Sequence, residues 1–218
     1  MTERFLKIDG HNTYHEWHLI MESMSIEMPE PKTHTVELDG TDGALDLSEA
    51  LAGRMTYKDR ALSFTFITDY GTRDDRTLIL DAIARTVHGK RVRLIEPDHP
   101  YMYLDARLRL ADKANTNAYA SLKITGTASP YYTANEDISH DIVLTGDEMN
   151  VAITNGGSKQ VLPLLTVTGS VTIASNGKTT SLSDGKYTVS DIRLNPGANI
   201  FTVNGNGTIK FTWREGYL

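Results

Sequence analysis

Apolar and polar side chains alternate along most of this chain, and this period of two constrains its fold more than any other feature. From Met102 to Leu110 every second residue is apolar, and a matching stretch, Ala118–Ala128, follows the turn at residues 115–117. Successive side chains of a strand point to opposite faces, so such stretches build sheets with one buried and one solvated face. The sequence therefore predicts a mainly β protein in which these two stretches form a long antiparallel hairpin.

Helical periodicity is convincing only in the stretch Arg73–His88. Thr72 precedes it as an N-cap, Asp75 has the capping-box spacing, and Gly89 follows as a stop signal. The apolar stripe expected to pack on the sheet consists of Leu78, Ile79, Ala82, Ile83 and Val87. The first half is thus expected to be an α+β domain, with one helix on a sheet.

Further elements of the first half follow from the same patterns. Leu62, Phe64 and Phe66 share one face of an alternating stretch and are expected to be buried. The expected strands are Glu16–Met28, Thr33–Leu38, Arg60–Thr68 and Arg91–Ile95. A short helix is expected at Asp46–Leu51, ended by Gly53.

The second half has a different sequence pattern, with shorter strands and more turn signals. A polar, acidic stretch at residues 133–139 separates it from the first, so we place one domain at residues 1–134 and another at 135–218. Asn-Gly, Asp-Gly and Pro-Gly pairs then recur, and such pairs supply the backbone angles of tight turns. The expected strands between them are Leu164–Ile173, Tyr187–Leu194, Asn199–Val203 and Thr208–Trp213. Short, evenly spaced strands predict a small β-sandwich or jelly roll, with Ile209, Phe211 and Trp213 in its core.

Composition excludes several classes of function. The formal net charge is −6, without a block of Lys or Arg, so the footprint of a nucleic-acid binder is absent. There is no cysteine for a disulfide, a thiolate metal site or a thiol nucleophile. The start of the chain lacks the pattern of a signal peptide, and no apolar run is long enough for a membrane span. We therefore expect a soluble protein made in a cytoplasm, without membrane insertion.

Three histidines form the sharpest cluster of potential metal ligands. His11, His15 and His18 would converge on one side of a helix and could then bind zinc. Asp9-Gly10 before them and the alternation after them instead favour a loop that enters a strand, where His15 and His18 point to opposite faces. Surface or interface histidines are the preferred interpretation, and no metal is expected.

The acidic residues Asp39, Asp42, Asp46 and Glu49 lie in a glycine-containing loop. They lack the spacing and the closing bidentate Glu of an EF-hand, so a solvated loop, or one that docks on a basic partner, is the better interpretation. Gly40 and Gly43 are expected to have positive φ angles there. The sequence contains no nucleophile elbow, Walker loop or dinucleotide fingerprint, and we expect no enzymatic activity and no cofactor.

Aromatic residues of the second half allow a different function. Tyr131, Tyr132, Tyr187, Trp213 and Tyr217 could form a platform on which sugars stack. Packing in the core or at an interface is the preferred interpretation. A carbohydrate-binding adhesion module remains the alternative function, and a hydrolase is the third and weakest.

Two stretches together resemble a known family. The first is Leu38-Asp39-Gly40-Thr41-Asp42-Gly43-Ala44-Leu45-Asp46-Leu47-Ser48-Glu49-Ala50, followed by residues 55–60 and the Phe64-Thr65-Phe66 strand; the second is the C-terminal stretch Gly205-Asn206-Gly207-Thr208-Ile209-Lys210-Phe211-Thr212-Trp213-Arg214-Glu215-Gly216-Tyr217-Leu218. Both are similar to motifs of the distal tail (Dit) proteins of siphophages that infect Gram-positive bacteria. The order of elements between them also matches, so the resemblance covers nearly the whole chain.

The resemblance implies a structural component of the phage tail tip or baseplate. The N-terminal domain would form a hexameric ring around the tail channel, and a galectin-like C-terminal sandwich would decorate its outside. The expected partners are copies of the chain, the tail tube protein, the tail-associated tip protein and receptor-binding or baseplate proteins, with DNA only passing through the channel. The site would be the distal end of the virion tail, after assembly in the host cytoplasm. Contacts within the ring are expected at Gly40, Asp42, Gly43, Asp46 and Glu49.

Overall fold

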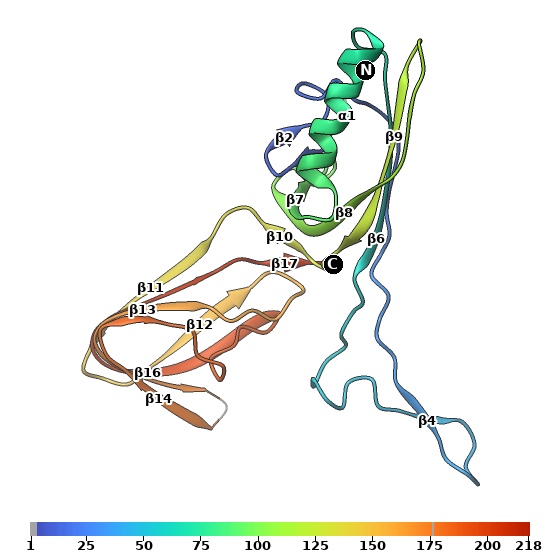
Figure 1. Ribbon diagram of the computed structural model, residues 1–218. Coiled ribbons are helices and arrows are strands. Elements are labelled where there is room, and N and C mark those ends of the chain that lie inside the picture. Colours follow the sequence, from blue (N-terminus) through green and yellow to red (C-terminus); the bar gives the residue numbers. More distant parts are fainter. Residues whose placement is uncertain (1–3, 176) are drawn as a thin grey trace. The chain divides into compact units, whose positions relative to one another are not determined.

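The computed structural model describes residues 4–175 and 177–218, which form two compact units that divide between Pro130 and Tyr131 (Figure 1). Strand β10 (Tyr132–Ala134) belongs to the second unit. The stretch at residues 133–139, expected to be a linker, therefore contains a strand and the start of another, β11 (Ile138–Thr145).

The first unit is built on one antiparallel sheet. Its strands lie in the order β2 (His11–Asn12), β1 (Lys7–Ile8), β7 (Arg91–Ile95), β8 (Met102–Asn115), β9 (Ala120–Ala128), β6 (Arg60–Thr68) and β3 (Ile20–Ile26). The expected hairpin is confirmed: β8 and β9 pair from Ala106 opposite Ala128 to Asn115 opposite Ala120. A register shift between Leu110 and Asp112 marks a bulge in β8. The expected strand at residues 16–28 begins only at Ile20, because residues 13–17 form turns.

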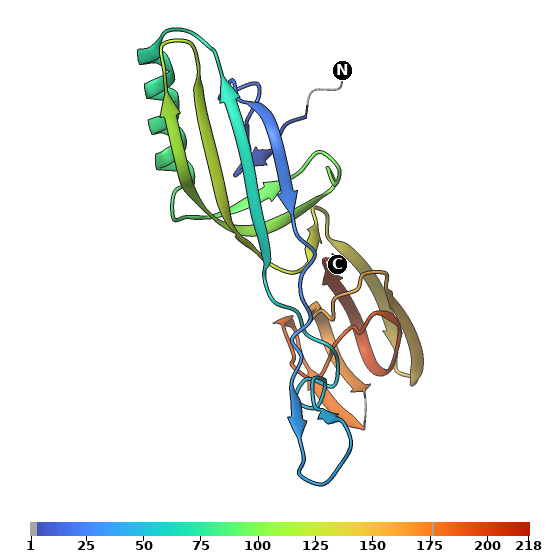
Figure 2. The ribbon, with the colours of Figure 1, turned by 90° about the vertical axis from the view of Figure 1, so that its right-hand side faces the viewer.

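Alternation along these strands separates two chemically different faces. Leu62, Phe64 and Phe66 of β6 are buried, as predicted, and pair with Gly126, Ile124 and Leu122 of β9. Their neighbours Ala61, Ser63 and Thr65 point to the opposite face, as alternation requires. Helix α1 (Arg73–Val87) packs on one side of β8 and β9 (Figures 1 and 2). One face of the sheet is therefore a core face, and the other is polar.

Helix α1 begins and ends near the expected residues but presents a different face to the sheet. Both hydrogen bonds of the capping box between Thr72 and Asp75 are present. Hydrogen bonds from the Thr72 N–H and hydroxyl lower the pKa of the Asp75 carboxyl. The buried positions are Arg76, Leu80, Ile83 and Val87, whereas Leu78 of the expected stripe is 68% exposed. The predicted stripe was wrong at Leu78 because pattern analysis treats an arginine as a solvent residue, and here Arg76 occupies the first position of the buried row.

The Arg76 side chain joins the start of α1 to the tip of the β8–β9 hairpin. It is 1% exposed. Its guanidinium donates to the carbonyl oxygens of Gly71 (2.9 Å), Thr116 (3.0 Å) and Asn117 (3.0 Å) and to Oδ1 of Asn115 (3.3 Å). The charge is thus dispersed over neutral acceptors, which is how a buried cation avoids the cost of desolvation without a carboxylate partner.

The second unit is a curled antiparallel sheet with one core. Strands β11, β16 (Gly197–Trp213), β13 (Leu164–Ser175) and β14 (Lys178–Leu182) lie in that order; β12 (Met149–Asn155) also pairs with β16, and β15 (Gly185–Tyr187) with β13. One half of β16 pairs with β12 and the other half with β11, so the long strand belongs to both layers. Residues of both halves, such as Phe201 and Phe211, meet in the same core cluster.

Two expectations about these strands were wrong. Residues 199–203 and 208–213 belong to the single strand β16, and Asn204-Gly205 and Asn206-Gly207 form no turn between them. Gly205 and Gly207 do have positive φ angles, but a Cβ on either would collide with backbone oxygens of β13. These glycines permit close contact between strands that curl, rather than a hairpin. Of the expected strand Tyr187–Leu194, only Tyr187 pairs in the sheet, as the last residue of β15, and the rest is a loop with one bridge between Val161 and Leu194.

The last residues of the chain close the second unit. Glu215 is buried and accepts hydrogen bonds from the Gly156 N–H (2.6 Å) and from the Tyr217 hydroxyl. The hydrogen bond to this carboxylate raises the pKa of the Tyr217 phenol. Ser158 and the following residue donate backbone N–H groups to the Gly216 carbonyl. The C-terminal motif thus ties the chain end to the loop at residues 155–159, a role that the sequence pattern did not reveal.

No helix in the described part of the chain is both long and apolar enough to cross a membrane.

Replacement of Arg76 by methionine is expected to lower the free energy of unfolding by about 3 kcal/mol or more, because several buried carbonyl groups lose their donor. Urea denaturation measures this loss. Arg73→Met, on the exposed side of the same helix, is the matched control and should change stability by less than about 0.5 kcal/mol. Equal stability of the two variants would show that the guanidinium is not needed to hold the hairpin.

Replacement of Trp213 by alanine should cost the second unit about 3–5 kcal/mol, because the indole is 6% exposed and belongs to the core. Thermal melting measures the loss, and Trp213→Phe should recover most of it. A wild-type melting curve together with lost binding to cell-wall glycans would contradict the structural role and support the adhesion module.

Candidate functional site: an exposed arm of the first unit

The segment between β3 and β6, residues 27–59, forms an arm that carries the first sequence motif. It is the blue to teal segment labelled at β4 (Thr35–Glu37) in Figure 1. Hydrogen bonds across the arm run from Glu27 N to Ala61 O, from Lys32 N to Thr56 O and from Leu47 N to His34 O. Its outer part is the two-stranded pair of β4 and β5 (Ala44–Asp46). The arm is thus a long ribbon held by backbone hydrogen bonds.

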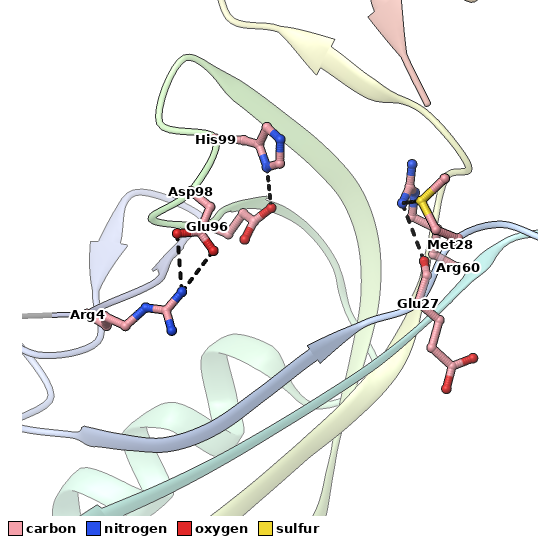
Figure 3. A network of polar contacts seen from close by, with 7 residues as sticks. All are labelled: Arg4, Glu27, Met28, Arg60, Glu96, Asp98 and His99. Atoms are coloured by element: carbon pink, nitrogen blue, oxygen red, sulfur yellow. Dashed lines mark hydrogen bonds and ion pairs between the residues drawn. The ribbon is translucent and has the colours of Figure 1, made fainter.

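Arg60 fixes the base of this ribbon. Its side chain is buried and donates from Nε to the Pro130 carbonyl (2.8 Å) and from Nη1 to the Glu27 carbonyl (3.3 Å), with the Met28 sulfur also in contact (Figure 3). Further out, an ion pair between Lys58 and Glu30 (2.9 Å) bridges the two sides. The hydrogen bond from Lys58 lowers the pKa of the Glu30 carboxyl. The attachment of the arm to the sheet is therefore defined by specific contacts.

Figure 3 also shows polar contacts of the loop that follows β7. Arg4 forms a bidentate pair with the Asp98 carboxylate (2.8 and 3.2 Å), and the His99 ring bonds to Glu96. The Arg4–Asp98 pair connects the start of the chain to the loop after β7, and the His99–Glu96 bond lies within that loop.

Gly40 and Gly43 occupy the turn between β4 and β5, with φ angles of +82° and +78°. These angles agree with the sequence-based expectation of positive φ. A Cβ at either glycine would meet no atom within 4 Å, so the turn needs glycine for its backbone angles alone. The Thr41 N–H and hydroxyl both bond to the Leu38 carbonyl (3.3 and 3.0 Å). The turn is therefore closed by local hydrogen bonds and by the backbone angles of its two glycines.

The expected helix at Asp46–Leu51 was wrong. Asp46 ends β5, and residues 48–52 form turns. The Asp46 carboxylate accepts hydrogen bonds from the Ser48 hydroxyl and N–H, which lower the pKa of the Asp46 carboxyl. Such a local bond between a side chain and the backbone stabilises a turn in place of a helix, and it explains why this stretch is not helical. Glu49 contributes its carbonyl to Gly53 N (2.7 Å) and is exposed.

The arm exposes both charge and apolar surface. Between residues 37 and 49 the acidic side chains are Glu37, Asp39, Asp42, Asp46 and Glu49, with no Lys or Arg. The large apolar side chains Met28, Leu38, Leu45 and Leu51 are 71%, 50%, 51% and 101% exposed. A two-stranded ribbon without a core is marginally stable in water, and exposed leucines favour burial against a partner.

The three histidines lie together in sequence but do not form a ligand set. His11 Nδ1 bonds to the Glu16 carboxylate (2.7 Å), and its ring stacks on Trp17. His18 stacks on Tyr70 with ring centroids 3.8 Å apart. Among residues 4–175 and 177–218, no group of three His, Asp or Glu side chains is arranged to hold a metal ion, and this includes the acidic loop of the arm.

The aromatic residues of the second unit form no exposed platform. Tyr131, Tyr132 and Trp213 are buried, and Tyr187 and Tyr217 are half-buried. Tyr187 packs against the core cluster that contains Ile209, Phe211 and Trp213, which are 0%, 0% and 6% exposed. The indole Nε1 of Trp213 has no hydrogen-bond partner in the described part of the chain. Tyr131, Tyr132 and Trp213 therefore contribute to packing.

Comparisons with solved structures identify the fold. The Dit protein of phage SPP1, described as a paradigm of the hub adsorption apparatus in phages that infect Gram-positive bacteria, superposes with a TM-score of 0.72 at 14% identity over 99% of each chain. A chain of the phage P2 baseplate in its activated conformation with calcium gives a TM-score of 0.50 at 9% identity, over 97% of this chain and 98% of that one. No protein-family model and no curated protein matches the sequence. At these identities the comparisons establish a shared fold, which agrees with the resemblance drawn from the two motifs.

Replacement of Gly40 and Gly43 by valine should strain the turn of the arm by roughly 1–2 kcal/mol at each position, because a β-branched residue disfavours positive φ. Amide hydrogen exchange should then become faster in residues 35–46 and stay unchanged in the second unit. Ala50→Val, in the same arm but without a positive φ, is the matched control. Unchanged exchange in the arm of the double variant would contradict this role of the glycines.

Proposed function

We propose that this chain is a structural subunit of a siphophage tail tip, which assembles with copies of itself into a hexameric ring and anchors other tail proteins. The observation that carries the proposal is the shared fold with the Dit protein of phage SPP1 over 99% of both chains. The two sequence motifs support it independently of the fold. One of them forms the exposed arm, and the other closes the second unit.

The arm supports an assembly role on physical grounds. It has backbone hydrogen bonds and fixed contacts at its base, but Leu38, Leu45 and Leu51 are exposed to solvent. A segment of this kind is stabilised when another chain covers it. We place the contacts between copies, or with a neighbouring tail protein, at Gly40, Asp42, Gly43, Asp46 and Glu49.

In this role the chain joins the tail tube protein to the tail-associated tip protein and holds receptor-binding or baseplate proteins at the distal end of the virion tail. The N-terminal domain forms the ring, and the C-terminal sandwich faces outward. DNA passes through the channel. No enzymatic step is assigned, because the proposal requires only binding between proteins after assembly in the host cytoplasm.

The proposal predicts a closed ring with a hexameric mass when the purified protein is concentrated. Multi-angle light scattering measures the mass over a range of concentrations, and negative-stain images show whether the particle is closed. The Gly40→Val/Gly43→Val variant should assemble less well than Ala50→Val. A monomeric mass at every concentration, together with the absence of a ring from the virion, would falsify the proposal.

A further inference from the structure

The polar face of the first sheet gathers basic side chains that lie apart in the sequence. Arg91 of β7 lies opposite Arg107 of β8, and Arg109 follows two residues later on the same face of β8. All three side chains are exposed, and we call them the arginine row. The chain has a net charge of −6 and no block of Lys or Arg, so it is the order of the strands that brings these charges together.

No carboxylate forms an ion pair with the arginine row among residues 4–175 and 177–218. Arg107 Nη1 donates to the Gly89 carbonyl (2.8 Å), and Arg109 Nε donates to the Thr125 hydroxyl (3.2 Å). A guanidinium group carries five N–H donors, so most donors of the row stay available. The row can therefore bind an anionic group from outside the chain.

The other charged side chains of this face are placed in opposite pairs. Asp105 of β8 lies opposite Arg93 of β7, whose guanidinium lies 4.6 Å from the centre of the Tyr103 ring. Beyond the bulge, Asp112 lies opposite Lys123 of β9. These pairs balance one another locally, and the excess positive charge of the face belongs to the arginine row.

Two hollows lie along the arginine row, with volumes of about 350 and 590 Å³. Arg107 and Thr127 line both hollows, so the two adjoin and form one groove. Asp59 and Asp105 line the smaller hollow together with Arg91. The larger one is lined by two arginines, by the hydroxyl groups of β9 and by small or apolar residues, without a carboxylate. The larger hollow therefore favours an anionic ligand.

The strands beside the row have the chemistry of a phosphate-binding surface. Thr125 and Thr127 of β9 lie opposite Ser63 and Ala61 of β6 on this face, and neither strand contains an Asp or Glu. Proteins contact the backbone of nucleic acids through Arg and Lys together with the hydroxyl groups of Ser and Thr. A peptide that binds as an added strand needs unpaired backbone groups instead, and β9 and β6 are already paired on both sides.

The spacing of the row suits a chain of phosphates. Arg107 and Arg109 are two residues apart on one strand, which separates their Cα atoms by roughly 6.6 Å. Arg91 lies on the neighbouring strand, about 5 Å from Arg107. The planar fork of each guanidinium matches the oxygen atoms of a phosphate group. Three such groups along one groove can therefore contact successive phosphates of one strand.

We propose that the polar face of the first unit binds the phosphodiester backbone of double-stranded DNA without regard to base sequence, and that the arginine row contacts the phosphates. The inference goes beyond the proposed function, in which DNA only passes through a channel. It does not depend on a ring, because every group of the face belongs to one copy. The rest of the chain is acidic and repels DNA, which confines the contact to this face.

Neutralisation tests the arginine row in an anisotropy titration of a fluorescein-labelled DNA duplex. Arg107→Gln and Arg109→Gln should each raise the dissociation constant about tenfold at about 50 mM salt, because each removes one phosphate contact. Each should also reduce the slope of log K against log salt concentration by about 0.9. Arg85→Gln, on α1, removes the same charge from the opposite side of the sheet and is the matched control, which should change neither quantity. Duplexes of unrelated sequence should bind equally, and melting curves verify that each variant is folded.

A gain of affinity tests the face without the loss of a native contact. Ala61 is exposed, lies opposite Thr127 and lines the larger hollow. Ala61→Lys should lower the dissociation constant several-fold and steepen the salt slope by about 0.9, since it adds one cation to the groove. Leu78→Lys, on the exposed side of α1, adds the same charge and should leave both quantities unchanged. A misfolded variant cannot produce this pattern.

The outcomes separate DNA from other anions and this inference from the proposed ring. Poly-glutamate that binds as tightly as DNA, and that loses affinity in the same variants, would show that the face takes acidic protein segments and would overturn the DNA assignment. Equal effects of Arg85→Gln and Arg107→Gln, or no binding of DNA by the wild-type chain at about 50 mM salt, would overturn it as well and leave the ring in place. A chain that binds DNA but is monomeric at every concentration supports the inference and overturns only the ring.

Discussion

The first unit depends on one constraint: the apolar side chains on one face of its sheet must be buried, and helix α1 packs on that face over β8 and β9. Strands β8, β9 and β6 satisfy the constraint by alternation, which directs Leu108, Ile124 and Phe64 toward the core. The buried Arg76 then fixes where the helix begins, since its guanidinium donates to the carbonyls that the turn between β8 and β9 leaves unpaired. A cation placed among neutral acceptors is costly to remove, because each acceptor would remain buried without a donor. The position of α1 is therefore set by polar contacts as much as by apolar packing.

The second unit meets a different constraint, since its two layers share strands. A strand that serves both layers must curl, and β16 and β13 do so where Gly205 and Gly207 face Val171 and Gly169. The absence of side chains lets the two backbones approach there, and the positive φ angles increase the local twist. Phe201 and Phe211, which lie on the two sides of this point in one strand, consequently meet in one core.

The apolar side chains that the first unit leaves partly exposed link its fold to assembly. The core face of the sheet does not end at β6 but continues onto β3, where Met21, Met24 and Ile26 stay only half-buried. The arm adds exposed leucines and carboxylates to the same unit. Features of this kind are a liability in a monomer and are managed in nature by burial against another chain. The second unit has its own closure, in which Glu215 and the chain end bond to the loop at residues 155–159.

The sequence by itself determined whatever depends on local period and on neighbouring residues: the β8–β9 hairpin, the capping box at Thr72, the burial of Phe64 and the positive φ angles of Gly40 and Gly43. It did not determine which face of α1 is buried, because the acceptors of Arg76 come from a turn some forty residues away in the chain. It also did not reveal that Gly205 and Gly207 lie within one strand. A glycine with positive φ is as compatible with a tight turn as with a curled strand that lies close to its neighbour. Nor could it reveal the arginine row, because the row exists only once the order of strands is known. Only the tertiary structure decided these features, for one physical reason: each depends on a partner that lies far away along the chain and close by in space.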